Sequence, residues 1–210
     1  MTRAMRDDAS RPRLDANGLA IDGGRRVSLH LTAGECLGLT GSSGSGKTRL
    51  LRALADLDPV AGALHLAGEP REDLSGPDWR QRVMLVPAES YWWADRVIDH
   101  FPSPPGEDEL AALAIEPDFL ERAPSDVSSG ERQRLALLRA VVRRPRFLLL
   151  DEPTANLDAA NADRVEAWLM DRCRQAGAGL LWVSHDLAQL ARVADRALQL
   201  DSTGLREYQP

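Results

Sequence analysis

The pattern of apolar and polar positions divides the chain into a strand-rich N-terminal third and a longer part in which strands and helices alternate. Short apolar runs and alternating stretches predict strands, whereas apolar residues that recur three and four positions apart predict helices. The predicted strands span residues 14–21, 27–31, 36–40, 63–67, 83–86, 147–151, 180–184 and 197–200. The predicted helices span residues 47–56, 108–114, 130–143, 160–176 and 187–193. This order favours an α/β fold with an N-terminal antiparallel β subdomain and a parallel-sheet core.

A glycine-rich turn joins the strand predicted at 36–40 to the helix that begins at residue 47. Its sequence, GSSGSGKT, fits the phosphate-binding loop pattern, in which curled backbone N–H groups surround phosphate oxygens. The predicted phosphate ligands are Gly41, Ser42, Ser43, Gly44, Ser45, Gly46, Lys47 and Thr48. Lys47 brings a compact positive charge to the β and γ phosphates of a nucleotide, and the hydroxyl of Thr48 is a ligand for Mg²⁺. The alternative interpretation is a glycine-rich turn that binds nothing.

Two acidic residues follow the apolar run at 147–150. A buried strand there delivers Asp151 and Glu152 to the carboxyl edge of a parallel sheet, where ligands bind in open α/β folds. Asp151 is expected to hold Mg²⁺ with Thr48, and Glu152 is expected to polarise an attacking water molecule. Alone, such a pair is often only the end of a strand. Beside a phosphate-binding loop, it predicts nucleotide hydrolysis.

A short polar stretch, Ser128, Ser129, Gly130 and Glu131, lies at the start of the helix predicted at 130–143. Serine and glycine at this position act as a plain helix N-cap. A helix N-terminus also attracts anions, because its first N–H groups lack partners and its dipole is positive there. The residues themselves leave both interpretations open.

Composition narrows the class of protein. The net charge of −6 gives no general reason to bind nucleic acid, and no apolar run approaches the roughly 18 residues that cross a bilayer. Residues 1–13 are charged and lack an apolar segment, which predicts a flexible N-terminal tail rather than a secretion signal. Cys36 and Cys173 do not form a CxxC pattern, which predicts two structural thiols. Lys47 is the only lysine beside 25 arginines, which indicates a site that needs an ammonium group.

Together these motifs resemble those of the ABC-type ATPases, the nucleotide-binding domains of ATP-binding cassette proteins. GSSGSGKT is similar to the Walker A motif and FLLLDE to the Walker B motif of this family. The family's signature, D-loop and switch-histidine segment are matched by VSSGE at 127–131, TANLD at 154–158 and SHD at 184–186. The resemblance extends from about residue 14 to residue 201.

The resemblance implies a P-loop NTPase (RecA-like) fold. A parallel-sheet core would carry an N-terminal antiparallel β subdomain and a small, abbreviated helical subdomain at about 90–144, all within one domain at 14–210. The segment between Q-loop and signature, at about 88–127, is short and contains Pro102, Pro104 and Pro105, which favours a small helical lobe.

The resemblance also implies site roles. Two subunits would form a head-to-tail dimer around two ATP molecules, each held by Walker A of one subunit and by the signature of the other. Residues 128–131 would therefore contact the ATP of the partner, which is either a second copy or a homologous subunit. Glu152 and His185 would be catalytic, and Asp158 of the D-loop would cross the dimer interface. The implied cofactors are ATP and Mg²⁺.

The chain departs from the family pattern within its nucleotide site. Ser129 and Glu131 replace a Gly and a Gln of the signature, and the added Cβ of Ser129 would lie close to phosphate. No Phe, Tyr or Trp occurs before Trp79, so stacking on adenine is either lost or taken over by Arg25 or Arg26.

The Q-loop also departs from the family pattern. The glutamine expected after the strand at 83–86 is replaced by Ala88, and the neighbouring Glu89 is its candidate substitute. Tyr91, Trp92 and Trp93 follow, in the region that in the family receives a short helix of the permease. Large rings are typical interface anchors, although all three could instead fill the space beneath a short lobe. We expect at least one ring to face the groove.

The leading hypothesis is an ATP-hydrolysing subunit of an ABC transporter. It would be cytoplasmic and would reach the inner face of the cell membrane through a separate transmembrane permease. The alternatives are a soluble ABC ATPase that acts on a macromolecular complex, and a weakly hydrolysing structural subunit. Nucleic acid is not an expected partner. The transported substrate is not encoded here, because in this family the permease or a capture protein selects it.

Overall fold

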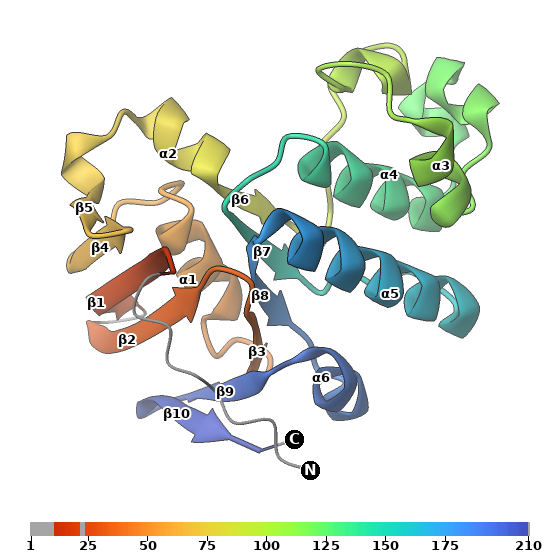
Figure 1. Cartoon of the computed structure of the whole chain (residues 1–210). Helices are drawn as coiled ribbons and strands as arrows, with labels where there is room; N and C mark the ends of the chain where they lie inside the picture. Colours follow the sequence, from red (N-terminus) through yellow and green to blue (C-terminus); the bar gives the residue numbers. More distant parts are fainter. Residues whose placement is uncertain (1–10, 22–23, 210) are drawn as a thin grey trace.

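The computed structural model describes residues 11–21 and 24–209, which fold into two β-sheets (Figure 1). The larger sheet has helices on both of its faces. The smaller sheet has the strand order β2-β1-β4-β5, and its paired strands are antiparallel. Its strands are β1 (Arg13–Ile21), β2 (Arg25–Thr32), β4 (Ala63–Leu66) and β5 (Glu69–Pro70). The predicted N-terminal antiparallel β subdomain is therefore confirmed.

The larger sheet has the order β10-β9-β3-β8-β7-β6 and is parallel except for its edge strand β10. Its strands are β3 (Cys36–Thr40), β6 (Val83–Val86), β7 (Phe147–Asp151), β8 (Gly179–Val183), β9 (Arg196–Asp201) and β10 (Gly204–Tyr208). Every residue of β3, β7 and β8 is buried, as expected for central parallel strands that are covered on both faces.

The helices complete the fold. They are α1 (Lys47–Leu54), α2 (Gly76–Arg82), α3 (Glu107–Ala112), α4 (Ser129–Val141), α5 (Ala159–Ala176) and α6 (Leu187–Val193). Figure 1 shows α4, α5 and α6 on one side of the larger sheet, with α1 and the smaller sheet on the other. Short 3-10 helices occur at Arg71–Asp73, Val97–His100, Pro117–Glu121 and Pro124–Asp126.

The larger sheet separates two hydrophobic clusters. Successive residues of β7 point to opposite faces, so Leu148 and Leu150 pack with α4 and α5 while Phe147 and Leu149 pack with α1. Cys173 of α5 and Cys36 of β3 are buried free thiols, as predicted. Burial raises the pKa of Cys173 to about 12, which suits a packing role rather than a reactive one.

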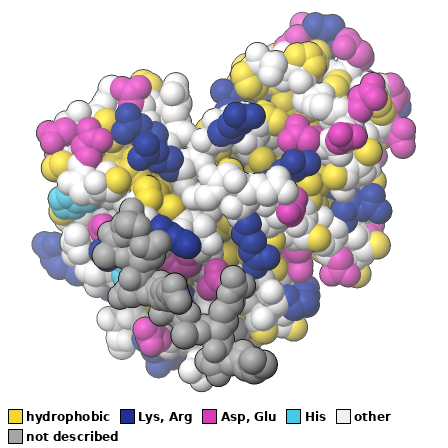
Figure 2. Space-filling model, in the orientation of Figure 1, with side chains coloured by type: hydrophobic (Ala, Val, Ile, Leu, Met, Phe, Trp, Pro, Cys, Tyr) yellow, Lys and Arg dark blue, Asp and Glu magenta, His cyan; other side chains and the backbone are white. Residues whose placement is uncertain are grey.

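The helical lobe between β6 and β7 is small, as predicted. Before α4 it contains one α-helix, α3, and three of the 3-10 helices. Figure 2 shows a notch between this lobe and the part of the molecule that carries α2. Pro102, Pro104 and Pro105 lie in irregular backbone within the lobe, because proline lacks the N–H that a helix interior requires.

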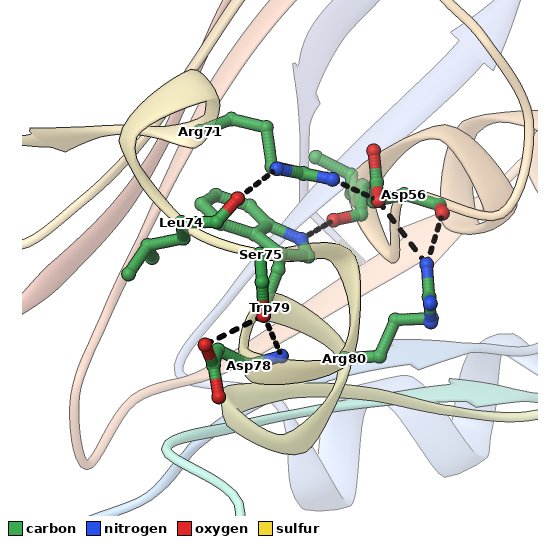
Figure 3. A network of polar contacts seen from close by, with 8 residues as sticks. Asp56, Arg71, Leu74, Ser75, Asp78, Trp79 and Arg80 are labelled. Atoms are coloured by element: carbon green, nitrogen blue, oxygen red, sulfur yellow. Dashed lines mark hydrogen bonds and ion pairs between the residues drawn. The ribbon is translucent and has the colours of Figure 1, made fainter.

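Helix α2 was not among the predicted helices, because its seven residues are too few to show a clear period. The hydroxyl of Ser75 caps it by accepting a bond from the N–H of Asp78 at 3.2 Å. Trp79 is fully buried and donates its indole N–H to the carbonyl of Leu54 at 2.9 Å (Figure 3). The capping side chain and this one tryptophan therefore fix α2 against the end of α1.

Asp56 ends α1 two residues earlier than predicted. Its φ of +55° leaves the helical region, so the helix stops at Leu54. Its carboxylate then pairs with Arg71 and, at 3.3 Å, with Arg80 (Figure 3). These contacts join α1 to the segment that leads into β6.

The remaining predicted boundaries fall within two residues of the observed ones, whereas β5 and β10 were missed. The predicted tail lies mostly outside the described residues. Within its last three positions, Arg13 already belongs to β1, and the carbonyl of Pro12 accepts a bond from Ala33 at 2.9 Å.

Candidate nucleotide site

The glycine-rich turn lies between β3 and α1, as the sequence predicted. Gly44 and Gly46 adopt φ values of +74° and +100°, which only glycine reaches without strain. Lys47 begins α1 and is 7% exposed, and its ammonium donates to the carbonyls of Gly41 and Ser42 at 2.8 and 3.1 Å. Burial lowers the pKa of Lys47, while the nearby carboxylates of Glu152 and Asp151 oppose that change.

Gly41 is required by a close backbone contact. A Cβ at this position would lie 2.3 Å from the carbonyl oxygen of Leu200 at the end of β9, and φ is +155°. The turn is therefore packed against the neighbouring strand without room for a side chain. This cradle fits a loop whose N–H groups must converge on one phosphate group.

Arg25 holds the same turn from the smaller sheet, which sequence reasoning did not foresee. Its guanidinium donates to the carbonyl of Ser45 and to the carbonyl of Asp201. Such bonds lie in the guanidinium plane and fix its orientation. Arg26, the other residue considered for adenine stacking, is exposed and donates to the carbonyl of Gly18 at 2.9 Å.

Thr48 and Asp151 are brought together from α1 and β7. The Thr48 hydroxyl donates to the Oδ2 atom of Asp151 at 2.8 Å. A hydroxyl beside a carboxylate at a phosphate cradle fits Mg²⁺, which takes oxygen ligands and usually few from the protein. No group of three metal-ligating side chains occurs within residues 11–21 and 24–209, in keeping with an ion that would also need nucleotide and water oxygens.

Glu152 and His185 face each other across the ends of β7 and β8. The Nε2 atom of His185 lies 3.4 Å from Oε1 of Glu152. Burial raises the pKa of Glu152, and the proximity of His185 partly opposes this rise. Glu152 has a φ of +49°, a conformation that costs about 1–3 kcal/mol in a non-glycine residue and is concentrated at functional sites. The arrangement places a half-buried carboxylate of raised proton affinity beside the Mg²⁺ candidate ligands.

The predicted signature residues form the start of α4. The Ser128 side chain accepts a bond from the N–H of Glu131 at 3.3 Å, and the Glu131 carboxylate accepts one from the N–H of Ser128 at 2.8 Å. These reciprocal bonds form a capping box. Hydrogen bonding with Ser128 is the main reason that the pKa of Glu131 is lowered. Both serines, Ser128 and Ser129, are exposed. These residues therefore cap the helix, and their exposed side chains also remain accessible to an anion.

Gly130 lies against the D-loop segment. A Cβ at this position would be 3.2 Å from the carbonyl oxygen of Asn156 and 3.3 Å from Leu157. Asp158 at the end of that segment is the N-cap of α5 and accepts bonds from the backbone and side chain of Asn161 at 2.9 and 2.8 Å. These bonds lower the pKa of Asp158, so its exposed carboxylate is charged.

Comparison with known proteins decides the family. A family model described as "ABC transporter" matches residues 25–155, which is more than half of the chain. The chain belongs to the ABC transporter family. As a member, it is an ABC-type ATPase that binds ATP.

Curated relatives agree with this assignment. The aliphatic sulfonates import ATP-binding protein SsuB of Pseudomonas entomophila (strain L48) is 36% identical over 192 residues, covering 84% of this chain and 67% of that protein. SsuB 2 of Nocardia farcinica (strain IFM 10152) is 38% identical over 185 residues, covering 84% of this chain and 72% of that protein. The chain spans about two thirds of the length of the first relatives that it matches, 67% and 66%.

Solved structures share the fold. A bacterial Atm1-family ABC exporter with ATP bound gives a TM-score of 0.79 at 23% identity, covering 94% of this chain and 39% of that one. A dimeric ATP-binding cassette in a post-hydrolysis state with ADP and Pi gives 0.78 at 21%, covering 93% and 98%. The predicted P-loop NTPase fold is confirmed.

A groove lies between the predicted Q-loop region after β6 and the start of α4, where the predicted signature lies. It has a volume of about 360 Å³ and is lined by Ala88, Glu89, Ser90, Trp92, Ser129, Arg132, Gln133 and Asn156. Glu89, the predicted Q-loop substitute, therefore lines the same space as Ser129 of the predicted signature and Asn156 of the predicted D-loop.

The aromatic triplet divides in two. Tyr91 and Trp93 are 81% and 72% exposed, so the idea that all three rings fill space beneath the lobe is wrong. Trp92 is half-buried and packs edge-on against His100, with the guanidinium of Arg139 4.4 Å from its ring centre. Burial, assisted by Arg143, lowers the pKa of Arg139 to about 10.

His100 supports this triplet and was missed by sequence reasoning. It is 2% exposed, and its Nε2 atom accepts bonds from the backbone N–H groups of Trp93 and Ala94 at 2.8 and 3.0 Å. Its Nδ1 atom faces the carbonyl of Arg96 at 3.1 Å. The histidine therefore holds the backbone that presents the exposed rings, a role that no local motif signals.

Proposed function

We propose that the chain is the ATP-binding and ATP-hydrolysing subunit of an ABC transporter and that two copies, or this chain and a homologous subunit, close head-to-tail around two ATP molecules. The observation that carries the proposal is the convergence of Glu152, His185, Thr48 and Asp151 at the carboxyl edge of the sheet, beside the cradle that contains Lys47. Phosphoryl transfer to water needs a phosphate cradle, metal ligands and a group that activates water, and these residues supply a candidate for each.

The residues have distinct tasks. The cradle from Gly41 to Thr48 orients the phosphates through backbone N–H groups, and Lys47 neutralises charge on the β and γ oxygens. Thr48 and Asp151 hold Mg²⁺, which when bound supplies positive charge to the phosphate oxygens. Glu152 accepts the proton of the attacking water, and His185 orients that water and the γ phosphate. The raised pKa of Glu152 makes its carboxylate a stronger proton acceptor.

The signature acts on the ATP of the partner. The exposed Ser128 and Ser129 and the N–H of Gly130 contact the γ phosphate held by the other subunit, and Asp158 reaches across the interface. The close approach of the Gly130 backbone to Asn156 supports this role, because residues 154–158 then lie beside residues 128–131 within one subunit. Glu131 stabilises the start of α4 through the capping box.

The other proposed partner is a transmembrane permease that docks beside Glu89 and the aromatic triplet. Within residues 11–21 and 24–209, none of the helices has the length and apolar character that crossing a membrane requires. The exposure of Tyr91 and Trp93 supports a docking role. Trp92, which packs against Arg139, lies between them in the sequence and is half-buried. The chain would thus work at the inner face of the membrane, and the relatives named as import ATP-binding proteins favour an importer.

Glu152→Gln tests the proposal. The variant keeps the size of the side chain but cannot accept a proton, so hydrolysis should fall by about 100-fold or more while ATP binding is kept. Size-exclusion chromatography with ATP should then show an accumulated dimer. The matched control is Glu207→Gln on the edge strand β10, which should hydrolyse ATP at the wild-type rate. Undiminished turnover by Glu152→Gln would show that this base assignment is wrong.

A weakly hydrolysing subunit is a second candidate. The carboxylate of Glu131 occupies the N-terminal turn of α4, where the family signature would meet a phosphate, and it adds negative charge there. Glu131→Gln should then raise the ATPase rate of the purified protein. An unchanged or lower rate would argue against this candidate.

A further inference from the structure

Gln189 of α6 is buried among polar groups from three other elements, and none of the sequence motifs includes it. It is 4% exposed. Its side-chain nitrogen donates to the hydroxyl of Thr154 and to the carboxylate of Glu166 on α5, both at 2.7 Å. Its side-chain oxygen accepts the indole N–H of Trp182 on β8 at 3.2 Å. One amide therefore joins a loop, a strand and two helices.

The partners leave the amide only one orientation. The indole of Trp182 can only donate, so it must face the oxygen of Gln189. An ionised carboxylate can only accept, so Glu166 must face the nitrogen. Glu166 is 7% exposed and is also paired with Arg192 at 2.9 Å. Each donor and acceptor of the Gln189 side chain therefore has a partner of the opposite kind, and a neutral amide is the group that fits the centre of the network.

The network ties together the two segments that carry the candidate catalytic groups. Thr154 lies two residues after Glu152, and Gln189 lies four residues after His185. Where β7 and β8 end, the ladder between them ends too, with the N–H of Glu152 still bonded to the carbonyl of Val183 at 3.2 Å. Beyond that point, the Gln189 side chain bridges the loop after Glu152 and the helix after His185.

We infer that Gln189 is a positioning residue for hydrolysis, because its amide fixes the His185 segment against the Glu152 loop through Thr154 and Glu166. This inference rests on the proposed roles of Glu152 and His185. A displacement of about 1 Å at a reacting group can cost up to about 100-fold in rate, so a bridge of this kind has a measurable effect. Gln189 itself touches neither nucleotide nor water in this role.

Gln189→Glu is the sharpest test. The new carboxylate keeps the size of the amide, but it would face Glu166 at the former 2.7 Å contact and could bridge the pair only when one of the two is protonated. The charged groups that face position 189 are Glu166 from α5, and Arg192 and Asp186 from α6. The kcat ratio of variant to wild type should therefore rise as pH falls from about 9 to about 6, from a reduction of about tenfold or more towards unity.

Two further variants keep the test decisive. Thr154→Val removes only the hydroxyl contact and should lower kcat without adding a pH dependence to the ratio. The control is Gln175→Glu, because Gln175 makes a comparable 2.8 Å bond to Asp171 on the exposed face of α5. It should show a ratio near unity at every pH. ATP affinity should change by less than about threefold in all three variants, since the phosphate cradle is intact.

The outcomes are separable. If Gln189→Glu and Thr154→Val both hydrolyse ATP at the wild-type rate, or if the Gln189→Glu ratio is constant with pH, the positioning role is refuted. If Glu152→Gln retains turnover, the proposed function fails instead, whatever Gln189 does. Far-UV circular dichroism and urea unfolding of Thr154→Val establish whether a lost rate reflects lost folding, and an unfolded Thr154→Val at assay temperature would also count against the inference.

Discussion

The side chain of Glu152 and that of His185 approach within 3.4 Å, although the two residues lie on different strand ends and 33 positions apart in the sequence. Burial raises the pKa of the Glu152 carboxyl, and His185 is the first of the groups that oppose this. Burial and the nearby His185 therefore both influence the pH range in which the proposed base is active.

The pH dependence of hydrolysis should reveal this coupling. A base acts when it is deprotonated, so kcat should fall as pH drops through the raised pKa of Glu152, above the ordinary value of 4.5. His185→Ala removes an influence that lowers this pKa, so the acidic limb should move to higher pH while kcat also falls. Profiles of kcat against pH at saturating ATP measure both effects. His30→Ala, at an exposed position on β2, is the control, and an unmoved limb in His185→Ala would contradict the coupling.

Gly41→Ala and Gly44→Ala should differ although both glycines belong to the cradle. Both have positive φ, which costs an alanine about 1–2 kcal/mol at the +74° of Gly44 and more at the +155° of Gly41. Only at Gly41 would the new Cβ meet a backbone oxygen, 2.3 Å away, whereas nothing lies within 4 Å at Gly44. Urea unfolding should show a larger loss of stability for Gly41→Ala, and its ATP affinity should fall further. Equal losses would show that the close contact is relieved by a small movement.

Arg25→Met should weaken nucleotide binding by about 10- to 100-fold, because it removes charge-assisted bonds to the carbonyl of Ser45 in the cradle and to the carbonyl of Asp201 at the end of β9. Comparing ATP with inorganic triphosphate separates two roles. If Arg25 only shapes the cradle, both ligands lose affinity equally. If its fixed plane also stacks on adenine, ATP loses more. Arg26→Met is the matched control and should bind both ligands normally.

The aromatic triplet should separate stability from coupling. Tyr91→Ala removes an exposed ring and should change stability by less than about 0.5 kcal/mol. Trp93→Ala should cost about 0.5–1.5 kcal/mol, because the Trp93 ring, although largely exposed, lies edge-on to His100 with ring centres 4.6 Å apart. Trp92→Ala removes a half-buried ring beside Arg139 and should cost about 1–2 kcal/mol, less than the roughly 3–5 of a core tryptophan. In membranes that contain the permease, all three should lower transport per ATP hydrolysed. Transport at the wild-type level in Trp93→Ala would contradict the docking role.

Local motifs predicted the glycine-rich turn and the strand ends well, because the backbone geometry of such short sequences is sterically restricted. Gly44 and Gly46 have the positive φ that the pattern requires, and Thr48 and Asp151 meet although 103 positions separate them. The reason is that parallel strands bring their carboxyl ends to one edge of the sheet. Asp151 ends β7, and Thr48 follows the turn that leaves the end of β3. Helix α2 was not predicted, because its packing depends on one buried tryptophan, Trp79, rather than on a repeated apolar pattern.

The sequence by itself determined the fold class, the cradle and the acidic strand end, since periodicity and turn chemistry are local properties. Tertiary structure alone decided what supports them. Arg25, which lies in the smaller sheet, donates a hydrogen bond to the carbonyl of Ser45. Gln189 donates hydrogen bonds to both Thr154 and Glu166. It also divided the aromatic triplet into a half-buried Trp92 and an exposed Trp93. Such contacts depend on which surfaces meet after folding, and a side chain that bonds across 20 to 40 positions leaves no periodic signal in its own neighbourhood.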